Sequence, residues 1–282
     1  MSNLIRETLL PNGMKVFYLV SREISVIYDE VQEYFRNGIE LHEGDTVFDV
    51  GANIGLFTLW VYQLCNKNVN VYAFEPIPAI FEVLQRNAQR FDPQTQKLKV
   101  FPCGLSRESK MTTFAYHPNA PAWSNAYPDD WKQDWEEKRE RALLNYKDAP
   151  PHIRRLRWVP PFLRSLIVNY SLKKLFATEM VSCQMRTISD ILREQNVQRI
   201  DLLKVDVEKD ELEVLLGIEE PDWPKIKQVF LEVHDIDGRL QKIIELLKRH
   251  ELSEITVTQE GIFKGSNIFA LYALKRKSAR NH

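Results

Sequence analysis

The sequence predicts an α/β fold in which helices cover both faces of a mostly parallel β-sheet. Short segments that are apolar almost throughout alternate with segments whose apolar residues recur at the helical period. Strands buried on both faces have this continuous apolar character, and their alternation with helices is typical of parallel sheets. The last two apolar segments flank Glu260 and Gly261, which predicts an antiparallel hairpin at the end of the sheet.

The first 40 residues predict an N-terminal hairpin and helix that precede the main domain of residues 41–282. Apolar residues on both sides of Pro11, Asn12 and Gly13 indicate two strands joined by a tight turn, because Asn-Gly favours short hairpin loops. Over residues 24–35 the apolar positions have helical spacing, which predicts a helix that ends near Gly38.

The elements of the main domain follow from apolar runs and helical periodicity. Parallel strands are expected at residues 46–50, 69–74, 97–101, 200–207 and 228–233. Helices are expected at residues 54–64, 78–89, 210–217 and 239–249. One more helix is expected after Thr187, which forms a capping signal with Asp190 three positions later. The C-terminal hairpin is expected at residues 254–258 and 267–274.

Residues 115–181 interrupt this alternation and predict an inserted helical lid over the ligand edge of the sheet. The segment contains two Pro-Pro pairs and four of the six tryptophans, and its apolar spacing indicates helices after Pro128 and over residues 163–175. Between Pro150 and Phe176 there are six basic residues and no acidic one. This stretch is either a solvated face of the lid or a docking surface for an acidic partner such as an acyl carrier protein.

Composition excludes several classes of protein. The chain has 282 residues, 44% hydrophobic and 27% charged, which argues against disorder, collagen and coiled coil. Its formal charge of −1 makes a nucleic-acid partner unexpected. Cys65, Cys103 and Cys183 lack the spacing of a disulfide framework or a zinc site. Without a secretion signal or a membrane-length apolar run, we expect a cytoplasmic protein with no membrane partner.

The first candidate site is a strand, a glycine-containing turn and a helix start within residues 47–55. Glycine lets a backbone turn sharply and approach a ligand without a Cβ in the way. Glu75 ends the next strand, where a carboxylate can accept hydrogen bonds from both ribose hydroxyls. The sequence therefore predicts a cofactor that contains a nucleoside.

The glycine pattern distinguishes between nucleoside cofactors. The dinucleotide fingerprint requires glycine at positions 51, 53 and 56, whereas this chain has Gly51, Asn53 and Leu56. S-Adenosylmethionine has no phosphate that must approach the backbone, and its amino group suits an acid such as Asp49. The mismatch therefore favours S-adenosylmethionine over a dinucleotide.

Polar residues also gather at the predicted carboxyl edge of the sheet, where ligands bind in open α/β folds. Lys204 and Asp206 share one face of a strand, and a lysine in an apolar strand needs a partner such as Asp206, Glu208 or Glu232. Lys204 is accordingly either part of a structural ion pair or a site residue. Asp206 and Glu208 are expected in the site because they follow the strand.

His234 ends the neighbouring predicted strand at the same edge. Imidazole is the commonest side chain for moving a proton in a transition state, so His234 or Asp206 is a candidate general base. A histidine at a strand end can equally be a plain surface residue. A divalent cation on Asp206, Glu232 and His234 would suit these ligand types, and the sequence leaves the metal undecided.

These motifs resemble one known family. FDVGANIGLFT, AFEP, DLLKVDVEKDELEVLLG and FLEVHD are similar to segments of the FkbM family of S-adenosylmethionine-dependent methyltransferases. The resemblance implies a Rossmann-like class I methyltransferase fold and O-methylation. It implies cofactor contacts from Asp49, Gly51, Asn53, Gly55 and Glu75, and a site lined by Lys204, Asp206 and Glu208. The family usually has glycine and a small residue where this chain has Lys209 and Asp210.

The sequence thus predicts an S-adenosylmethionine-dependent O-methyltransferase. The acceptor is expected to be a hydroxyl of a small molecule, a sugar or a carrier-tethered, polyketide-like natural product. Candidate catalytic residues are Lys204, Asp206, Glu208 and His234, and Asp206 is assigned to the cofactor as well. The alternatives are an NAD-type oxidoreductase, a nucleic-acid methyltransferase and a binding protein without activity.

Overall fold

The computed structural model describes residues 5–126, 159, 163, 167, 169–170, 173–175, 177–259 and 264–276. The chain divides into two compact units, one formed by Met1–Thr112 with Ser182–His282 and the other by Thr113–Val181. The N-terminal elements and the central sheet both belong to the first unit. They are therefore described together.

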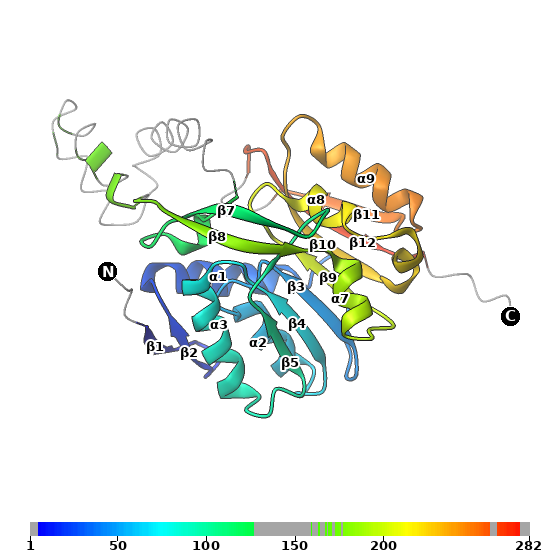
Figure 1. Ribbon diagram of the computed structural model, residues 1–282, viewed down its shortest axis with the longest axis horizontal. Helices are drawn as coiled ribbons and strands as arrows, with labels where there is room; N and C mark the ends of the chain where they lie inside the picture. The colour runs from blue at the N-terminus through cyan, green and yellow to red at the C-terminus, as the bar shows by residue number, and fades with distance from the viewer. Residues whose placement is uncertain are drawn as a thin grey trace, which may run out of the picture. The chain divides into compact units, whose positions relative to one another are not determined.

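A seven-stranded sheet forms the centre of the first unit (Figure 1). Its strands are β3 (Thr46–Val50), β4 (Asn70–Phe74), β5 (Leu98–Phe101), β9 (Leu202–Val205), β10 (Gln228–His234), β11 (Glu254–Thr258) and β12 (Ile268–Leu274). They lie in the order β11-β12-β10-β9-β3-β4-β5. The pairs from β10 to β5 are parallel, whereas β12 is antiparallel to both β10 and β11. The predicted sheet with its C-terminal hairpin is confirmed.

Helices follow the strands near the predicted places. They are α1 (Ser21–Glu33), α2 (Leu56–Leu64), α3 (Pro78–Phe91), α7 (Ile188–Glu194), α8 (Glu211–Leu216) and α9 (Arg239–Arg249). The capping signal before α7 is present, because the Thr187 hydroxyl oxygen accepts a 3.0 Å hydrogen bond from the Asp190 N–H. α2 begins at Leu56 rather than Ile54, because Gly55 has a left-handed φ of 89°.

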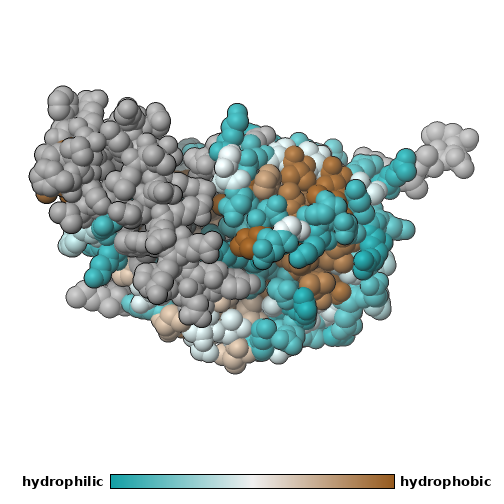
Figure 2. Space-filling view, turned by 90° about the horizontal axis from the view of Figure 1, so that it is seen from above, coloured by the Kyte–Doolittle hydropathy of each residue, from teal (hydrophilic) through white to brown (hydrophobic). Residues whose placement is uncertain are grey.

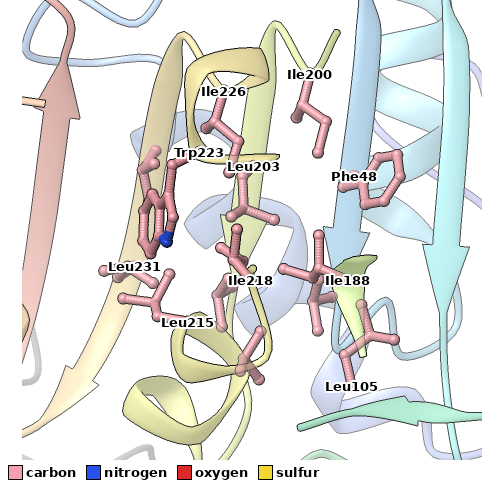
Figure 3. Packing of buried hydrophobic residues seen from close by; sticks show 14 of the residues in the cluster. Phe48, Leu105, Ile188, Ile200, Leu203, Leu215, Ile218, Trp223, Ile226 and Leu231 are labelled. Atoms are coloured by element: carbon pink, nitrogen blue, oxygen red, sulfur yellow. The ribbon is translucent and has the colours of Figure 1, made fainter. Parts of the chain in front are cut away.

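The two faces of the sheet pack against different helices. Phe48 and Leu203 lie in a buried apolar core with residues of α7, α8 and α9 (Figure 3). The opposite face carries Asp49, Lys204 and Phe230 in register on neighbouring strands. Truncating a buried leucine such as Leu203 to alanine costs about 2–5 kcal/mol, so this core holds the strands that carry the polar residues.

A buried amide on α3 links the N-terminal hairpin to the turn before α2. Strands β1 (Arg6–Leu9) and β2 (Lys15–Tyr18) pair antiparallel around Gly13, as predicted. Asn87 of α3 accepts a 2.7 Å hydrogen bond from the Phe17 N–H and donates to the Phe17 carbonyl at 3.0 Å. The same amide donates to the Ile54 carbonyl at 2.8 Å, which links the hairpin to the turn before α2.

A three-stranded sheet is the main element that the sequence analysis missed. It has the order β6-β8-β7 and consists of β6 (Gly104–Leu105), β7 (Lys110–Tyr116) and β8 (Glu179–Arg186). The predicted insertion is thus flanked by strands, not only built of helices. Cys183 and Met185 of β8 are buried between more exposed neighbours, which is the alternation of a half-buried strand. A search for continuous apolar runs does not detect such strands.

Much of the predicted lid lies outside the described residues. These include 127–158, with the first expected helix and with Arg154, Arg155 and Arg157. Within the second expected helix, the described residues 163, 167, 169–170 and 173–175 are helical.

The described surface is mostly hydrophilic in the view of Figure 2, with a patch of hydrophobic side chains. Exposed apolar residues include Leu216 of α8 and Val257 of β11. Among the described helices, none has the length and apolar character needed to cross a membrane.

Candidate functional site

The turn between β3 and α2 has an unusual backbone because β9 ends directly against it. Gly51, Asn53 and Gly55 have positive φ angles of 76°, 50° and 89°. A Cβ on Gly51 would lie 1.9 Å from the backbone oxygen of Asp206, so no larger residue fits without moving the turn. The sequence analysis attributed this glycine to ligand approach. The structure adds that the chain's own backbone requires it.

Glu75 lies beside this turn, just after β4. Its Oε2 accepts a hydrogen bond from the Asn53 N–H at 3.2 Å, and Oε1 accepts one from the Ile77 N–H at 2.9 Å. Burial raises the pKa of the carboxyl to about 7, although both hydrogen bonds favour the charged form. Each carboxylate oxygen has a second lone pair, so Glu75 can accept further donors from a ligand.

Asp49 is fully buried at the end of β3 and has one oxygen left unsatisfied. The Thr58 hydroxyl donates a 2.6 Å hydrogen bond to Oδ2. Among the residues that the structure describes, Oδ1 accepts no hydrogen bond of suitable geometry, although Lys204 Nζ lies 3.1 Å away. Because buried polar atoms normally have partners, this oxygen is a candidate acceptor for a donor on a bound molecule.

Lys204 of β9 is buried and joins three parts of the site. Its Nζ donates to the Gly51 carbonyl at 2.9 Å and lies 3.1 Å from Asp49 Oδ1 and 3.4 Å from Asp206 Oδ2. Burial alone lowers the pKa of an ammonium, but the Asp49 and Asp206 carboxylates raise it above its ordinary value. Lys204 therefore stays charged, with one hydrogen bond to a carbonyl and two carboxylate oxygens within 3.4 Å.

Asp206 follows β9 and contacts the N-terminal region of the chain. Its carboxylate is partly exposed and accepts a 3.2 Å hydrogen bond from the Tyr34 hydroxyl at Oδ2. Tyr34 comes directly after α1 and packs against Phe57 and Phe230, with ring centroids 5.6 and 4.4 Å apart. From the sequence alone Tyr34 is an apolar position of the predicted helix, since nothing local links it to Asp206.

His234 lies between two carboxylates. Nδ1 is 2.8 Å from Glu211 Oε1, and Nε2 is 3.3 Å from Glu208 Oε2. Burial opposes the charged ring, but the hydrogen bonds with Glu208 and Glu211 raise the pKa of His234 to about 10. At neutral pH both ring nitrogens then carry protons, an arrangement that suits a hydrogen-bond donor rather than a base. The general-base role of His234 stays a prediction that this geometry disfavours.

Glu211 organises the loop around His234 and was missed by the sequence analysis. It is fully buried, and its oxygens accept hydrogen bonds from the Lys209 N–H at 3.0 Å and from Arg239 at 3.2 Å. Its place three residues after Glu208, at the start of α8, is a signal that could have identified it. Lys209 has a φ of 74°, so the loop takes the left-handed turn that glycine favours although a lysine occupies the position.

Glu232 of β10 is one of the residues that the sequence offered as metal ligands. Burial, followed by the charges of Asp206 and Glu208, raises the pKa of Glu232 well above its ordinary value. Within the described part of the chain, no three His, Cys, Asp or Glu side chains are arranged to hold a metal ion.

Comparison with known proteins identifies the family of this chain. Residues 49–253, from the last strand positions of β3 to beyond α9, match the family model described as the methyltransferase FkbM domain. The chain belongs to the FkbM methyltransferase family. The family match supports a methyltransferase over the NAD-type oxidoreductase that the sequence had left as an alternative.

Individual relatives extend the comparison over nearly the whole methyltransferase chain. It is 35% identical to the 31-O-demethyl-FK506 methyltransferase FkbM of Streptomyces tacrolimicus, over 97% of this chain and 98% of that protein. It is 31% identical to the AMB antimetabolite synthetase AmbE of Pseudomonas aeruginosa, over 95% of this chain but 12% of the synthetase.

A solved structure supports the fold. The methyltransferase FkbM of Methylobacillus flagellatus matches with a TM-score of 0.52 and 15% identity, over 85% of this chain and 46% of that chain. The predicted class I methyltransferase fold is confirmed.

Proposed function

We propose that this methyltransferase transfers a methyl group from S-adenosylmethionine to a hydroxyl oxygen of a small natural product or sugar, free or carrier-tethered. The observation that carries the proposal is the pair of buried carboxylates beside the glycine turn. Glu75 has lone pairs for two sugar hydroxyls, and Asp49 Oδ1 lacks a hydrogen bond of its own. The name of the Streptomyces relative, a 31-O-demethyl-FK506 methyltransferase, supports oxygen as the acceptor atom.

The residues present fit this cofactor. Glu75 would hold the ribose, Asp49 would face the amino group, and the turn from Gly51 through Asn53 to Gly55 would line the binding surface. When bound, S-adenosylmethionine supplies a methyl group activated by a sulfonium. Lys204 fixes the relative positions of these groups, because its ammonium contacts the Gly51 carbonyl and the carboxylates of Asp49 and Asp206.

Asp206 is the residue that we assign to the acceptor's proton. Its partly exposed carboxylate lies at the edge of the sheet, whereas His234 is held protonated between Glu208 and Glu211. His234 then orients Glu208 by donating to it. General-base assistance contributes about 10²–10⁴ in rate. Alignment of donor and acceptor can contribute an effective molarity of about 10⁵–10⁸ M, so positioning is the larger effect.

A carrier-tethered acceptor is the second form of substrate that an observation favours. The similar segment of AmbE makes up 12% of a much longer synthetase, so related domains exist within assembly enzymes. For the basic stretch, the sequence left open a solvated face and a docking surface for an acidic carrier protein. The stretch is partly outside the described residues, and that partner stays a prediction. Faster methylation of a tethered acceptor than of the same free acceptor would support it.

Calorimetry followed by mass spectrometry tests the proposed function. S-Adenosylhomocysteine should bind the wild-type protein with a saturable heat, whereas NAD should give none. Hydroxylated candidates incubated with S-adenosylmethionine should gain the mass of one CH₂ group, and the new methyl should be on oxygen. Absence of S-adenosylhomocysteine binding would contradict the proposal.

A further inference from the structure

One residue at the site comes from outside the matched domain. The family match begins at residue 49, whereas Tyr34 directly follows α1. Its hydroxyl donates a 3.2 Å hydrogen bond to Asp206 Oδ2, 172 positions away along the chain. The residue after the N-terminal helix therefore places its hydroxyl against the Asp206 carboxylate at the edge of the sheet.

We propose, on the basis of the proposed function, that Tyr34 is a positioning residue that orients Asp206 to receive the proton of the acceptor hydroxyl. Tyr34 does not need to touch the acceptor for this role. It fixes which oxygen of Asp206 is engaged by the protein and which oxygen is presented to the acceptor.

The contacts at Asp206 give this orientation. The Tyr34 hydroxyl and Lys204 Nζ both meet Oδ2, at 3.2 and 3.4 Å. Across the described residues, no hydrogen bond or ion pair involves the other oxygen, Oδ1. A carboxylate held through one oxygen by two donors has little freedom to rotate, so Oδ1 keeps a constant direction.

The tyrosine itself is held rigidly. Its side chain is buried, and its ring packs against Phe57 of α2 and Phe230 of β10. Packed aromatic rings in a core occupy a single rotamer, and a buried phenol needs a hydrogen-bond partner. Asp206 is the partner that the geometry provides.

The charges around this pair keep the phenol as a donor. Burial, and then the carboxylates of Asp206, Glu232 and Glu30, raise the pKa of Tyr34 well above its ordinary value. On the other side of Asp206, Lys204 is paired with Asp49 of β3. Tyr34 thus keeps its proton throughout the pH range in which the enzyme would work.

Replacing Tyr34 by phenylalanine tests the proposal, with Tyr28→Phe as the matched control. Tyr28 lies in α1, six residues before Tyr34, and its ring packs edge-on against Trp60. In Tyr34→Phe we expect kcat to fall about tenfold, the effect of losing one charge-assisted hydrogen bond. The acidic limb of the kcat profile should move to higher pH, because the charged carboxylate has lost a donor. The KM for the acceptor and S-adenosylhomocysteine affinity should change little, and Tyr28→Phe should match the wild type.

A structural role would give a different result. If Tyr34→Phe lowers the melting temperature and kcat but leaves the pH profile unchanged, the proposal is overturned. An unchanged kcat would also overturn it.

A thermal double-mutant cycle supplies a measurement that does not depend on activity. Tyr34→Phe should lower the melting temperature of the wild type but have little effect in an Asp206→Asn background, since the contact is already weakened. Additive effects of the two substitutions would contradict the coupling. If the wild type neither binds S-adenosylhomocysteine nor methylates hydroxyls, the proposed function fails while this cycle still tests the contact between Tyr34 and Asp206.

Discussion

At the scale of single residues, hydrogen-bond partners decide how each titratable group of the site behaves. Lys204 and His234 are both buried cations, and each is kept charged by two carboxylates. Glu75 has only backbone N–H donors, so burial dominates and its pKa rises to about 7. The charge of Lys204 also favours the ionised form of Glu75, but burial outweighs it.

Replacing Glu75 by alanine should weaken S-adenosylhomocysteine binding about tenfold to a hundredfold. Hydrogen bonds to a charged group contribute about 1.5–3 kcal/mol, and each 1.4 kcal/mol is a factor of about ten in affinity. Calorimetry measures the effect, and circular dichroism checks that the variant is folded. The matched control is Glu82→Ala, which removes an exposed carboxylate paired with Arg86 on α3. Intact affinity in Glu75→Ala would refute the assigned role.

The pH dependence of binding follows from the same carboxyl. Its pKa is raised to about 7, so the ionised form that accepts two hydroxyl donors increases as the pH rises from 5 towards 8. Affinity of the wild type for S-adenosylhomocysteine should therefore increase over this interval and level off above it. Calorimetry of Glu75→Ala should give an affinity that is nearly constant over the interval. An equal slope in both proteins would assign the effect to another group.

His234 should make the protein less stable as the pH rises. Its pKa is raised from 6.5 to about 10, so its contribution to stability is complete below pH 6.5 and is lost as the pH rises towards 10. His234→Gln should lower the melting temperature strongly at pH 6 and only weakly near pH 10. His42→Gln, at an exposed histidine, is the control. A difference that is constant with pH would contradict the assigned charge.

At the scale of elements, the turn between β3 and α2 depends on close contact with the end of β9. The Asp206 N–H donates to the Val50 carbonyl at 3.0 Å, and the Asp206 carbonyl occupies the space beside Gly51. The turn and the acid that follows β9 therefore move together. A change that displaces one must displace the other.

Gly51→Ala should accordingly disturb both stability and cofactor binding. The added Cβ would meet a backbone oxygen at 1.9 Å, whereas Gly44→Ala places a Cβ in open space at a similar positive φ of 84°. Gly44→Ala should therefore cost only the left-handed backbone penalty of about 1–2 kcal/mol. Gly51→Ala should cost more in chemical denaturation and abolish S-adenosylhomocysteine binding in calorimetry. Equal effects of the two substitutions would contradict the close approach.

At the scale of the whole molecule, the N-terminal 40 residues are part of the same compact unit as the sheet. Asn87 joins the hairpin to the turn before α2, and Tyr34 joins the end of α1 to Asp206. The segment therefore completes the core on one side and contributes to the site. The compact unit therefore extends on the N-terminal side beyond residue 49, where the family match begins.

Deletion of residues 1–40 should lower stability and remove activity together. Asn87 would lose both Phe17 partners, and the aromatic residues that pack on Tyr34 would be exposed to water. Thermal melting and calorimetry with S-adenosylhomocysteine measure the two losses. A deleted protein that melts and binds as the wild type does would show that the segment is dispensable.

Most of the strands and helices could be predicted from the sequence because their causes are local. The parallel strands are buried on both faces and so are apolar throughout, and Gly51 and Gly55 mark the turn by their backbone freedom. β7 and β8 could not be identified in this way, because neither is apolar throughout: the first half of β7 is mostly exposed, and buried and exposed residues alternate in β8. The carboxylates at the sheet edge were predictable as a group, since the carboxyl ends of parallel strands meet there.

The sequence by itself determined the class of fold, the glycine turn and the acids that line it, because each depends on residues close together along the chain. The tertiary structure alone decided the pairings: Tyr34 with Asp206, Lys204 with Asp49, and His234 between Glu208 and Glu211. These contacts depend on how α1, β3, β9 and β10 lie against one another. Because a side chain's protonation is set by such neighbours, the chemistry of each group emerged only once the chain was folded.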